Sequence, residues 1–427
     1  MLFSSLDLAP EIQRAIDACG YSQMTPIQEQ AIIPARRGKD LLANAQTGTG
    51  KTAAFALPIL QQMMDRPKPT SPGNVRTLIL TPTRELAAQL AETIKRYAQF
   101  LPLTVTVLYG GVKMSAQENK LKAGVDIIVA TPGRLMEHMV QGTVNLSQVE
   151  FVVLDEADRM LDMGFIADVQ SLLQKTNKQH QTLLFSATIS QAVRELANKL
   201  LSRYETISVA KQNAIADTIE HVVYPVAESR KAELLIELIE KHNWFKVLVF
   251  TSTKAQADEL MTKLKQTTIK AVVCHSEKTQ GARRRAVAEF TEDKVQVLIA
   301  TEVAARGLDI QGLEHVVNYN LPYLAEDYVH RVGRTGRAGA TGQAISLVSR
   351  EEEVALANIE HLIGNKVKRI KMPGYEVGSR DTIIKNIEQR RRPQRSNKAT
   401  QTRIDTKKDG KSNGSAKNRV VKKKTRK

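Results

Sequence analysis

The eight residues Ala-Gln-Thr-Gly-Thr-Gly-Lys-Thr at positions 45–52 decide the fold of this 427-residue chain. They follow the short apolar segment 41–43, which is typical of a buried strand, and they precede the apolar helical stretch 53–60. A glycine-rich loop between a strand and a helix is typical of an α/β unit that holds an anion at the helix N-terminus. The sequence therefore predicts a phosphate-binding loop at this connection.

The residue types in this loop suit the phosphates of a nucleotide. Gly48 and Gly50 let backbone amides close around the β- and γ-phosphates. Lys51 is placed to reach the same phosphates, and Thr52 a magnesium ion. The standard pattern has glycine where this chain has Ala45, so a plain glycine turn before a helix stays open as the alternative.

An acidic pair supplies the second part of such a site. Asp155 and Glu156 directly follow the apolar run 151–154. At the end of a strand, Asp155 can hold magnesium through water, and Glu156 can polarise the attacking water. An acidic cap at the start of a helix is the simpler alternative.

Short apolar runs alternate with amphipathic stretches over most of the chain, and the pattern restarts after about residue 208. The expected strands are 77–80, 104–108, 126–130, 151–154 and 182–185 in the first half, and 247–250, 271–273, 295–300, 316–318 and 344–348 in the second. Continuous apolar runs are typical of parallel strands buried on both faces. The predicted fold class is α/β, with two tandem domains that carry parallel sheets. The predicted boundaries are 1–208 for the first domain, 209–217 for a linker, 218–365 for the second domain and 366–427 for a tail.

The positive charge of the chain is confined to its last part. The formal net charge is +17, and residues 366–427 account for all of it, with 22 basic and 5 acidic residues. Residues 1–365 contain 40 of each kind. The tail has little apolar surface, so we expect a disordered basic arm that binds a polyanion. A solubilising tail without a partner is the alternative.

The two cysteines and the N-terminus favour a protein that stays in the cytoplasm. Cys19 and Cys274 are too few and too far apart for a disulfide framework, and their spacing does not suit a metal site. The first ten residues contain no basic residue, and the chain has no apolar run long enough to span a membrane. We therefore expect no signal peptide.

Further short motifs surround the loop and the acidic pair in a fixed order. They are Gly20-Tyr21 with Thr25-Pro26-Ile27-Gln28, Pro82-Thr83-Arg84-Glu85-Leu86, Gly110-Gly111, Thr131-Pro132-Gly133-Arg134, Asp155-Glu156-Ala157-Asp158, Ser186-Ala187-Thr188, Val249 to Thr253, Gln280 with Arg283, Thr301 to Asp309, and His330 to Arg337. This series resembles the DEAD-box ATP-dependent RNA helicases of superfamily two over about residues 3–365. Among bacterial members, the basic tail is most similar to the RhlE-like group. The resemblance implies two RecA-like domains, with ATP and Mg²⁺ bound on one side of a cleft and single-stranded RNA across both domains.

The resemblance also implies roles for individual residues at the ATP site. The implied ATP contacts are Phe3, Tyr21, Gln28, Gln46, Thr47, Gly48, Thr49, Gly50, Lys51, Thr52, Asp155 and Asp309. The implied catalytic residues are Lys51, Glu156, Arg334 and Arg337, with Thr52 and Asp155 holding Mg²⁺ largely through water. The amide of Gln28 has a donor and an acceptor that match the edge of adenine, although an ordinary solvated helix residue is the alternative. An arginine fork suits the γ-phosphate better than lysine does, and a basic surface loop is the alternative for both arginines. Ser186, Thr188 and His330 are expected to couple hydrolysis to domain closure.

The implied RNA contacts lie on loops of both domains. They are Arg84, Gly111, Thr131, Gly133, Arg134, Thr253, Gln280, Arg283 and Thr301. Small residues and hydroxyls offer backbone amides and short donors to phosphates without reading sequence. Turn chemistry alone is the alternative for any single glycine or threonine. Two acids depart from the family pattern: Glu302 replaces an aspartate, and His275-Ser276-Glu277 replaces His-Gly-Asp, which puts local geometry in doubt.

The predicted function is RNA-stimulated ATP hydrolysis coupled to local, non-processive unwinding of short RNA duplexes or remodelling of RNA–protein complexes. Ribosomal precursors or the RNA-decay machinery are the expected partners, and no membrane partner is expected. An ATP-gated RNA clamp or assembly scaffold is the competing hypothesis. A DNA helicase is disfavoured by the Gln28 motif and by the segment 155–158.

Overall fold

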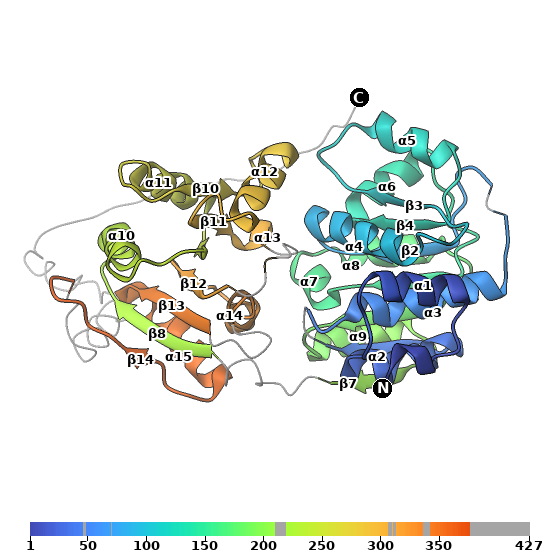
Figure 1. The fold of residues 1–427 in the computed structure, drawn as a ribbon, viewed down its shortest axis with the longest axis horizontal. Helices are drawn as coiled ribbons and strands as arrows, with labels where there is room; N and C mark the ends of the chain where they lie inside the picture. Colours follow the sequence, from blue (N-terminus) through green and yellow to red (C-terminus); the bar gives the residue numbers. More distant parts are fainter. Residues whose placement is uncertain are drawn as a thin grey trace, which may run out of the picture. The chain divides into compact units, whose positions relative to one another are not determined.

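The computed structural model describes residues 1–45, 48–69, 71–209, 219–305, 310, 313–335 and 342–375. Figure 1 shows two groups of strands, each flanked by helices. We call residues 1–209 the first lobe and residues 219–375 the second lobe. The described residues of both lobes belong to one compact unit.

The first lobe contains a parallel sheet of seven strands in the order β3-β4-β2-β5-β6-β1-β7. Its strands are β1 (Leu41–Asn44), β2 (Thr77–Leu80), β3 (Val105–Leu108), β4 (Ile127–Ala130), β5 (Phe151–Leu154), β6 (Gln181–Ser186) and β7 (Glu205–Ser208). Its helices are the short η1 (Phe3–Ser5), α1 (Pro10–Ala18), α2 (Pro26–Arg36), α3 (Lys51–Asp65), α4 (Arg84–Tyr97), α5 (Met114–Lys122), α6 (Pro132–Val140), α7 (Ala157–Asp162), α8 (Ile166–Leu173) and α9 (Gln191–Leu200).

The second lobe repeats this order as β10-β11-β9-β12-β13-β8-β14, again with parallel pairs. Its strands are β8 (Ile219–Pro225), β9 (Val247–Thr251), β10 (Ala271–Cys274), β11 (Val297–Thr301), β12 (His315–Asn318), β13 (Gly342–Val348) and β14 (Lys368–Arg369). Its helices are η3 (Glu228–Arg230), α10 (Lys231–His242), α11 (Lys254–Leu264), α12 (Gln280–Thr291), α13 (Glu302–Ala305), α14 (Ala325–Val332), η4 (Arg350–Glu352) and α15 (Glu353–Ile363). By position in the strand order of its sheet, β8 corresponds to β1, β9 to β2 and β12 to β5.

Each strand contributes side chains to two cores because its residues alternate between the faces of the sheet. Leu41 and Ala43 pack in one core with helices α1 to α4, whereas Leu42 packs in the other with helices α5 to α9. In β9, Val247 and Val249 face α10 and α11, and Leu248 faces α12 and α13. Burial on both faces explains the continuous apolar runs, and the predicted α/β class with parallel sheets is confirmed.

The predicted boundary between the second domain and the tail, at residue 366, falls inside the fold. The chain remains folded through residues 366–375, because β14 pairs with β8 and both Val367 and Met372 are buried. Arg369 makes two hydrogen bonds to the carboxylate of Glu353 on α15, and the backbone NH of Val367 donates to Glu360. Residues 376–427 and the central part of the predicted linker lie outside the described residues. Among the described residues, no helix combines the length and the apolar character needed to cross a bilayer.

Candidate active site and nucleic-acid interface

The carboxyl ends of parallel strands meet at one edge of a sheet, and most predicted site residues lie in the loops at these edges. Gly50 is the N-cap residue of α3 with a left-handed backbone, at φ 93°. The Nε2 atom of Gln28 donates to the carbonyl oxygen of Gly50 at 3.1 Å, and the side chain of Gln28 leaves no room for a Cβ at Gly50. The Oε1 atom of Gln28 accepts from the backbone NH of Thr25 at 2.8 Å. Gln28 is thus buried against the loop, and its alternative as a solvated helix residue is wrong.

Lys51 begins α3 and is buried directly after the glycine loop. Its Nζ atom lies 3.5 Å from Oδ1 of the buried Asp155. Nζ has no hydrogen-bond partner among the described residues. Burial lowers the pKa of Lys51, but the carboxylates of Asp155, Glu156 and Asp158 outweigh it, so the pKa is raised and the ammonium group stays charged. A buried cation with unused donors suits the phosphates of a nucleotide.

Glu156 is the second residue after β5 and has a left-handed backbone, at φ 56°. Its side chain makes no capping hydrogen bond to α7, so simple capping does not explain the residue. Burial raises the pKa of Glu156, and the ammonium group of Lys51 opposes this effect only in part. A left-handed conformation at a non-glycine residue costs free energy and is concentrated at functional sites. The geometry makes Glu156 a candidate general base.

A short network links the acidic segment to β6. The Oδ2 atom of Asp158 accepts from the backbone NH and the hydroxyl of Thr188, both at 2.9 Å. The hydroxyl of Ser186 donates to the carbonyl oxygen of Thr188 at 2.7 Å. Burial raises the pKa of Asp158, but His330, the cations of Lys51 and Arg159, and the hydrogen bond from Thr188 outweigh it, so the pKa is lowered. Ser186 and Thr188, two of the three residues predicted to couple hydrolysis to closure, thus form one network with Asp158. The third, His330, lines a pocket with Glu156 and Arg159.

A small pocket adjoins this network and contains residues from both lobes. It is lined by Glu156, Arg159, Phe250, Glu302, Ala305, His330 and Arg334. Arg159 pairs with Asp162 in its own lobe and with Asp327 of α14. This role for Arg159 could not be predicted, because an arginine that follows an acidic cluster on a helix is typical of a solvated residue.

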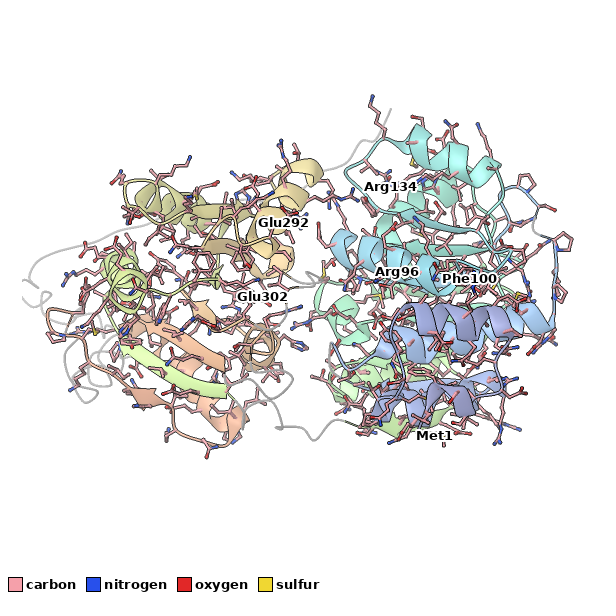
Figure 2. The ribbon with its side chains drawn as sticks, viewed as in Figure 1. Met1, Arg96, Phe100, Arg134, Glu292 and Glu302 are labelled. Atoms are coloured by element: carbon pink, nitrogen blue, oxygen red, sulfur yellow. The ribbon has the colours of Figure 1, made fainter. Side chains whose placement is uncertain are left out.

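Arg334 is buried at the end of α14, and its charge lowers the pKa of Glu156 against the larger effect of burial. Arg331, on the same helix, pairs with Glu302, donates to Asn318 at 3.1 Å and lies over the ring of Phe250. Glu302 (Figure 2), the departure from the family aspartate, thus holds an arginine of the second lobe. The predicted contacts Arg337, Asp309, Gln46 and Thr47 lie outside the described residues.

Phe3 and Tyr21, predicted to contact the base of ATP, pack together with ring centroids 6.2 Å apart. Phe3 is fully buried in the core, whereas Tyr21 is exposed. Phe3 is thus placed to support Tyr21. A direct contact of either ring with a nucleotide stays a prediction.

The predicted RNA contacts of the first lobe form one group at the carboxyl edge of its sheet. The guanidinium of Arg84 lies against Gly110 and Gly111, and an added Cβ at Gly111 would collide with it. Arg134 of α6, labelled in Figure 2, donates to the carbonyl oxygen of Val112 at 3.2 Å. The other two predicted RNA contacts of this lobe are Thr131 and Gly133. Thr131 is the buried N-cap residue of α6, and Gly133 has open space around it.

The predicted RNA contacts of the second lobe are held in a different way. Gln280 and Arg283 of α12 both bond to Glu85 of α4, each at 2.9 Å. Glu85 is therefore a functional candidate that the sequence analysis treated only as part of a motif. Thr301 is buried at the end of β11, and Thr253 is the exposed N-cap residue of α11.

Three features define the class of protein: a glycine loop with a buried lysine, an acidic pair after a nearby strand, and a buried arginine of the second lobe beside the acid. Together they define a two-lobed nucleotide-hydrolysing protein of the phosphate-loop class. Comparison with known proteins gives the family. The model of the DEAD/DEAH box helicase family matches residues 25–196, and the helicase conserved C-terminal domain matches residues 230–339.

Curated relatives are similar over most of their length. The ATP-dependent RNA helicase RhlB of Pseudomonas aeruginosa is 42% identical over 380 residues, which cover 88% of this chain and 96% of that protein. The DEAD-box ATP-dependent RNA helicase CshA of Bacillus subtilis is 39% identical over 371 residues, with 87% and 74% covered. This chain belongs to the family of DEAD-box ATP-dependent RNA helicases, as the sequence predicted. The finer assignment to the RhlE-like group stays a prediction.

Solved structures agree with this assignment. Dbp5 of S. cerevisiae, bound to RNA and ADP BeF3, superposes with a TM-score of 0.77 at 31% identity, covering 91% of this chain and 99% of that one. Mss116p, bound to ssRNA and AMP-PNP, gives a TM-score of 0.78 at 28% identity, with 91% and 82% covered. The tandem RecA-like architecture is therefore confirmed.

Proposed function

We propose that this helicase hydrolyses ATP in an RNA-stimulated reaction at the carboxyl edge of the first sheet and separates short RNA duplexes locally. The observation that carries the proposal is the buried ammonium group of Lys51, whose nearest carboxylate oxygen, on Asp155, lies 3.5 Å away. A buried charge with unused donors is costly unless an anion completes it. The γ-phosphate of ATP is the anion that the loop and the neighbouring acid suit best.

In the proposed reaction, each polar residue of the site has one task. Lys51 binds the phosphates, and the carboxylate of Glu156 accepts a hydrogen bond from the attacking water. Because burial raises the pKa of Glu156, its carboxylate is a stronger base than that of an exposed glutamate. Arg334 stabilises negative charge on the transferred phosphoryl group when the second lobe closes over it, and Arg337 is proposed to act beside it.

The donor set also fits Mg²⁺. Thr52 and Asp155 offer oxygen ligands next to the proposed phosphate position, and hard cations prefer such ligands, largely through water. When bound, Mg²⁺ would neutralise charge on the phosphate oxygens.

RNA is proposed to contact the loops that carry Arg84, Thr131, Arg134 and Thr253. Contacts to phosphates bind RNA without reading its sequence, which suits a protein that remodels many RNAs. We propose a cytoplasmic enzyme that acts on ribosomal precursors or on intermediates of RNA decay.

The competing function is an ATP-gated clamp that binds RNA and turns over slowly. Steady-state ATPase rates with single-stranded RNA, with single-stranded DNA and without nucleic acid separate the two functions, together with displacement of one strand of a short RNA duplex. We expect strong stimulation by RNA only, and strand displacement that requires ATP. A rate that is equal in all three conditions would contradict the proposal.

A further inference from the structure

The second lobe has a lysine at the place that Lys51 occupies in the first. β1 and β8 have the same position in their sheets, and Lys51 and Lys231 are the first residues of the helices that follow them. Between β8 and α10 the chain reads Val-Ala-Glu-Ser-Arg, without a glycine loop. Lys231 therefore stands at the end of a connection that cannot wrap a phosphate in the same way.

Carboxylates of the protein take the place of phosphates around Lys231. Its side chain is completely buried, and its Nζ atom bonds to Oε2 of Glu352 at 2.5 Å and to Oε2 of Glu228 at 2.7 Å. The ring of Tyr319 lies on another side, 5.8 Å from Nζ. Glu352 also accepts from the backbone NH groups of Leu321 and Ser349, so this acid is committed to the fold around η4.

The other oxygen of Glu228 faces two side-chain amides. Its Oε1 atom accepts from Nδ2 of Asn320 at 3.0 Å and from Nε2 of Gln256 at 3.4 Å. An amide that gives its NH₂ group to an acid must point its oxygen the opposite way. Glu228 thus sets the orientation of both amides at once.

Both amide oxygens then hold the loop that follows β9. Oδ1 of Asn320 accepts from the backbone NH of Ser252 at 3.2 Å, and Oε1 of Gln256 accepts from the backbone NH of Thr253 at 3.1 Å. Two consecutive NH groups are fixed by one carboxylate acting through two amides. Thr253 is exposed, and its hydroxyl donates to Oε1 of Gln256 at 3.2 Å and accepts from the backbone NH of Gln256 at 3.1 Å.

We propose that Glu228 is a positioning residue for RNA binding, which acts through Asn320 and Gln256 on the loop 252–253. The inference rests on the proposed contact between RNA and Thr253. Lys231 holds the carboxylate of Glu228 by an ion pair, so the lysine of the second lobe stabilises a contact with nucleic acid. Lys51 of the first lobe, in contrast, binds a nucleotide. Loss of Glu228 frees both amides to rotate, and the loop then binds RNA in several arrangements instead of one.

The first experiment measures ATPase rate against the concentration of oligouridine for Glu228→Ala. We expect the RNA concentration at half-maximal rate to rise about five-fold, the effect of losing one orienting hydrogen-bonded group, while kcat at saturating RNA stays near that of the unchanged protein. Glu352→Gln is the matched control, because it removes the other acid on Lys231 without touching the loop. It should lower the thermal midpoint and leave the half-maximal RNA concentration unchanged.

A second pair of variants separates loss of RNA binding from loss of folding, because each substitution keeps the shape of the side chain. Asn320→Asp places two carboxylates against each other and should weaken RNA binding. Adding Glu228→Gln gives Asp at position 320 a donor and keeps an acceptor for Lys231, but the new amide group can no longer accept from Gln256, so the double variant should regain part of the lost affinity.

These outcomes separate the inference from the proposed function. RNA-stimulated activity in the unchanged protein, together with normal RNA dependence in Glu228→Ala or no rescue in the double variant, would overturn the inference alone. Absence of RNA stimulation in the unchanged protein would overturn both.

Discussion

Lys51 and Lys231 begin helices that follow strands at the same position in two sheets of the same strand order, and the anions around the two lysines differ. The nearest carboxylate oxygen lies 3.5 Å from Nζ of Lys51, whereas two carboxylates lie at 2.5 and 2.7 Å from Nζ of Lys231. A buried ammonium group needs an anion in either case. The second lobe fills this place with its own glutamates, and we propose that the first lobe leaves it to a substrate.

The residues that follow the central strands differ between the lobes in a similar way. Glu156 is the second residue after β5, and Asn320 is the second residue after β12, which has the corresponding place in the second sheet. The first lobe presents a buried carboxylate there, and the second presents an amide that bonds to Glu228 and to the backbone of Ser252. We propose that the same fold serves chemistry in one lobe and positioning in the other.

The largest effect is expected for Glu156→Gln, which gives the first lobe an amide where the second lobe has one. The variant keeps the shape of the side chain but cannot act as a base, so kcat should fall by about 10⁴-fold, at the upper end for loss of a general base. Equilibrium binding of a non-hydrolysable ATP analogue should stay unchanged. Hydrolysis at the unchanged rate would show that Glu156 is not the base.

Arg334→Ala tests whether the second lobe contributes directly to the chemistry of the first. Arginine fingers supply about 10³-fold or more in rate, so RNA-stimulated kcat should fall by about 10³-fold. ATP affinity of the open protein should change little, since the finger acts on the closed state. An unaltered kcat would confine catalysis to the first lobe.

The acid side of the pH profile tests the environment of Glu156. Because burial raises its pKa above the ordinary 4.5, and because only the ionised carboxylate can accept a proton, kcat should fall ten-fold per pH unit below a pKa higher than 4.5. Protonation of Asp158 should not contribute in this range, as its pKa is lowered. An acid limb that persists in Glu156→Gln would assign the titration to another group.

Removal of residues 376–427 is expected to have the smallest effect on the rate. This segment carries 18 basic and 5 acidic residues, whereas residues 1–365 have no net charge, so we expect the segment to supply most of the salt-dependent affinity for RNA. RNA binding should weaken at low salt, and each lost phosphate contact should reduce the slope of log affinity against log salt by about 0.7. ATPase turnover at saturating RNA should change little. An unchanged slope would show that the segment does not bind RNA.

Much of the fold and of the ATP site could be predicted because these parts depend on local sequence. The central strands are continuous apolar runs, and the loop at 48–52 carries its own chemistry. β7 escaped prediction because only Ile207 of its four residues is buried, and β14 because it consists of two charged residues. The contact of Phe3 with the base of ATP, which the family resemblance implies, stays a prediction, and the ring of Phe3 is fully buried and packs against Tyr21.

The positioning network could not be predicted because its contacts are distant in sequence. Lys231 and Glu352 are 121 residues apart, and Asn320 and Glu228 are 92 apart. Glu228 is close to Lys231 in sequence, but a lysine in the first turn of an amphipathic helix is typical of a solvated residue, and nothing in the sequence indicates that Glu352 and Asn320 lie beside this pair. The same reason applies to Glu85 and Arg283, which meet across 198 positions of the chain.

The central claim is that the two lysines have opposite tasks, and the matched variants Lys51→Met and Lys231→Met test it most directly. For each, binding of a fluorescent ATP analogue and thermal unfolding are measured on the same sample. We predict that Lys51→Met loses nucleotide binding at a nearly unchanged unfolding midpoint. Lys231→Met should keep nucleotide affinity per folded molecule but lose about 3 kcal/mol of stability, because two carboxylates remain without their cation. Full nucleotide binding by Lys51→Met, or undiminished stability of Lys231→Met, would contradict the account.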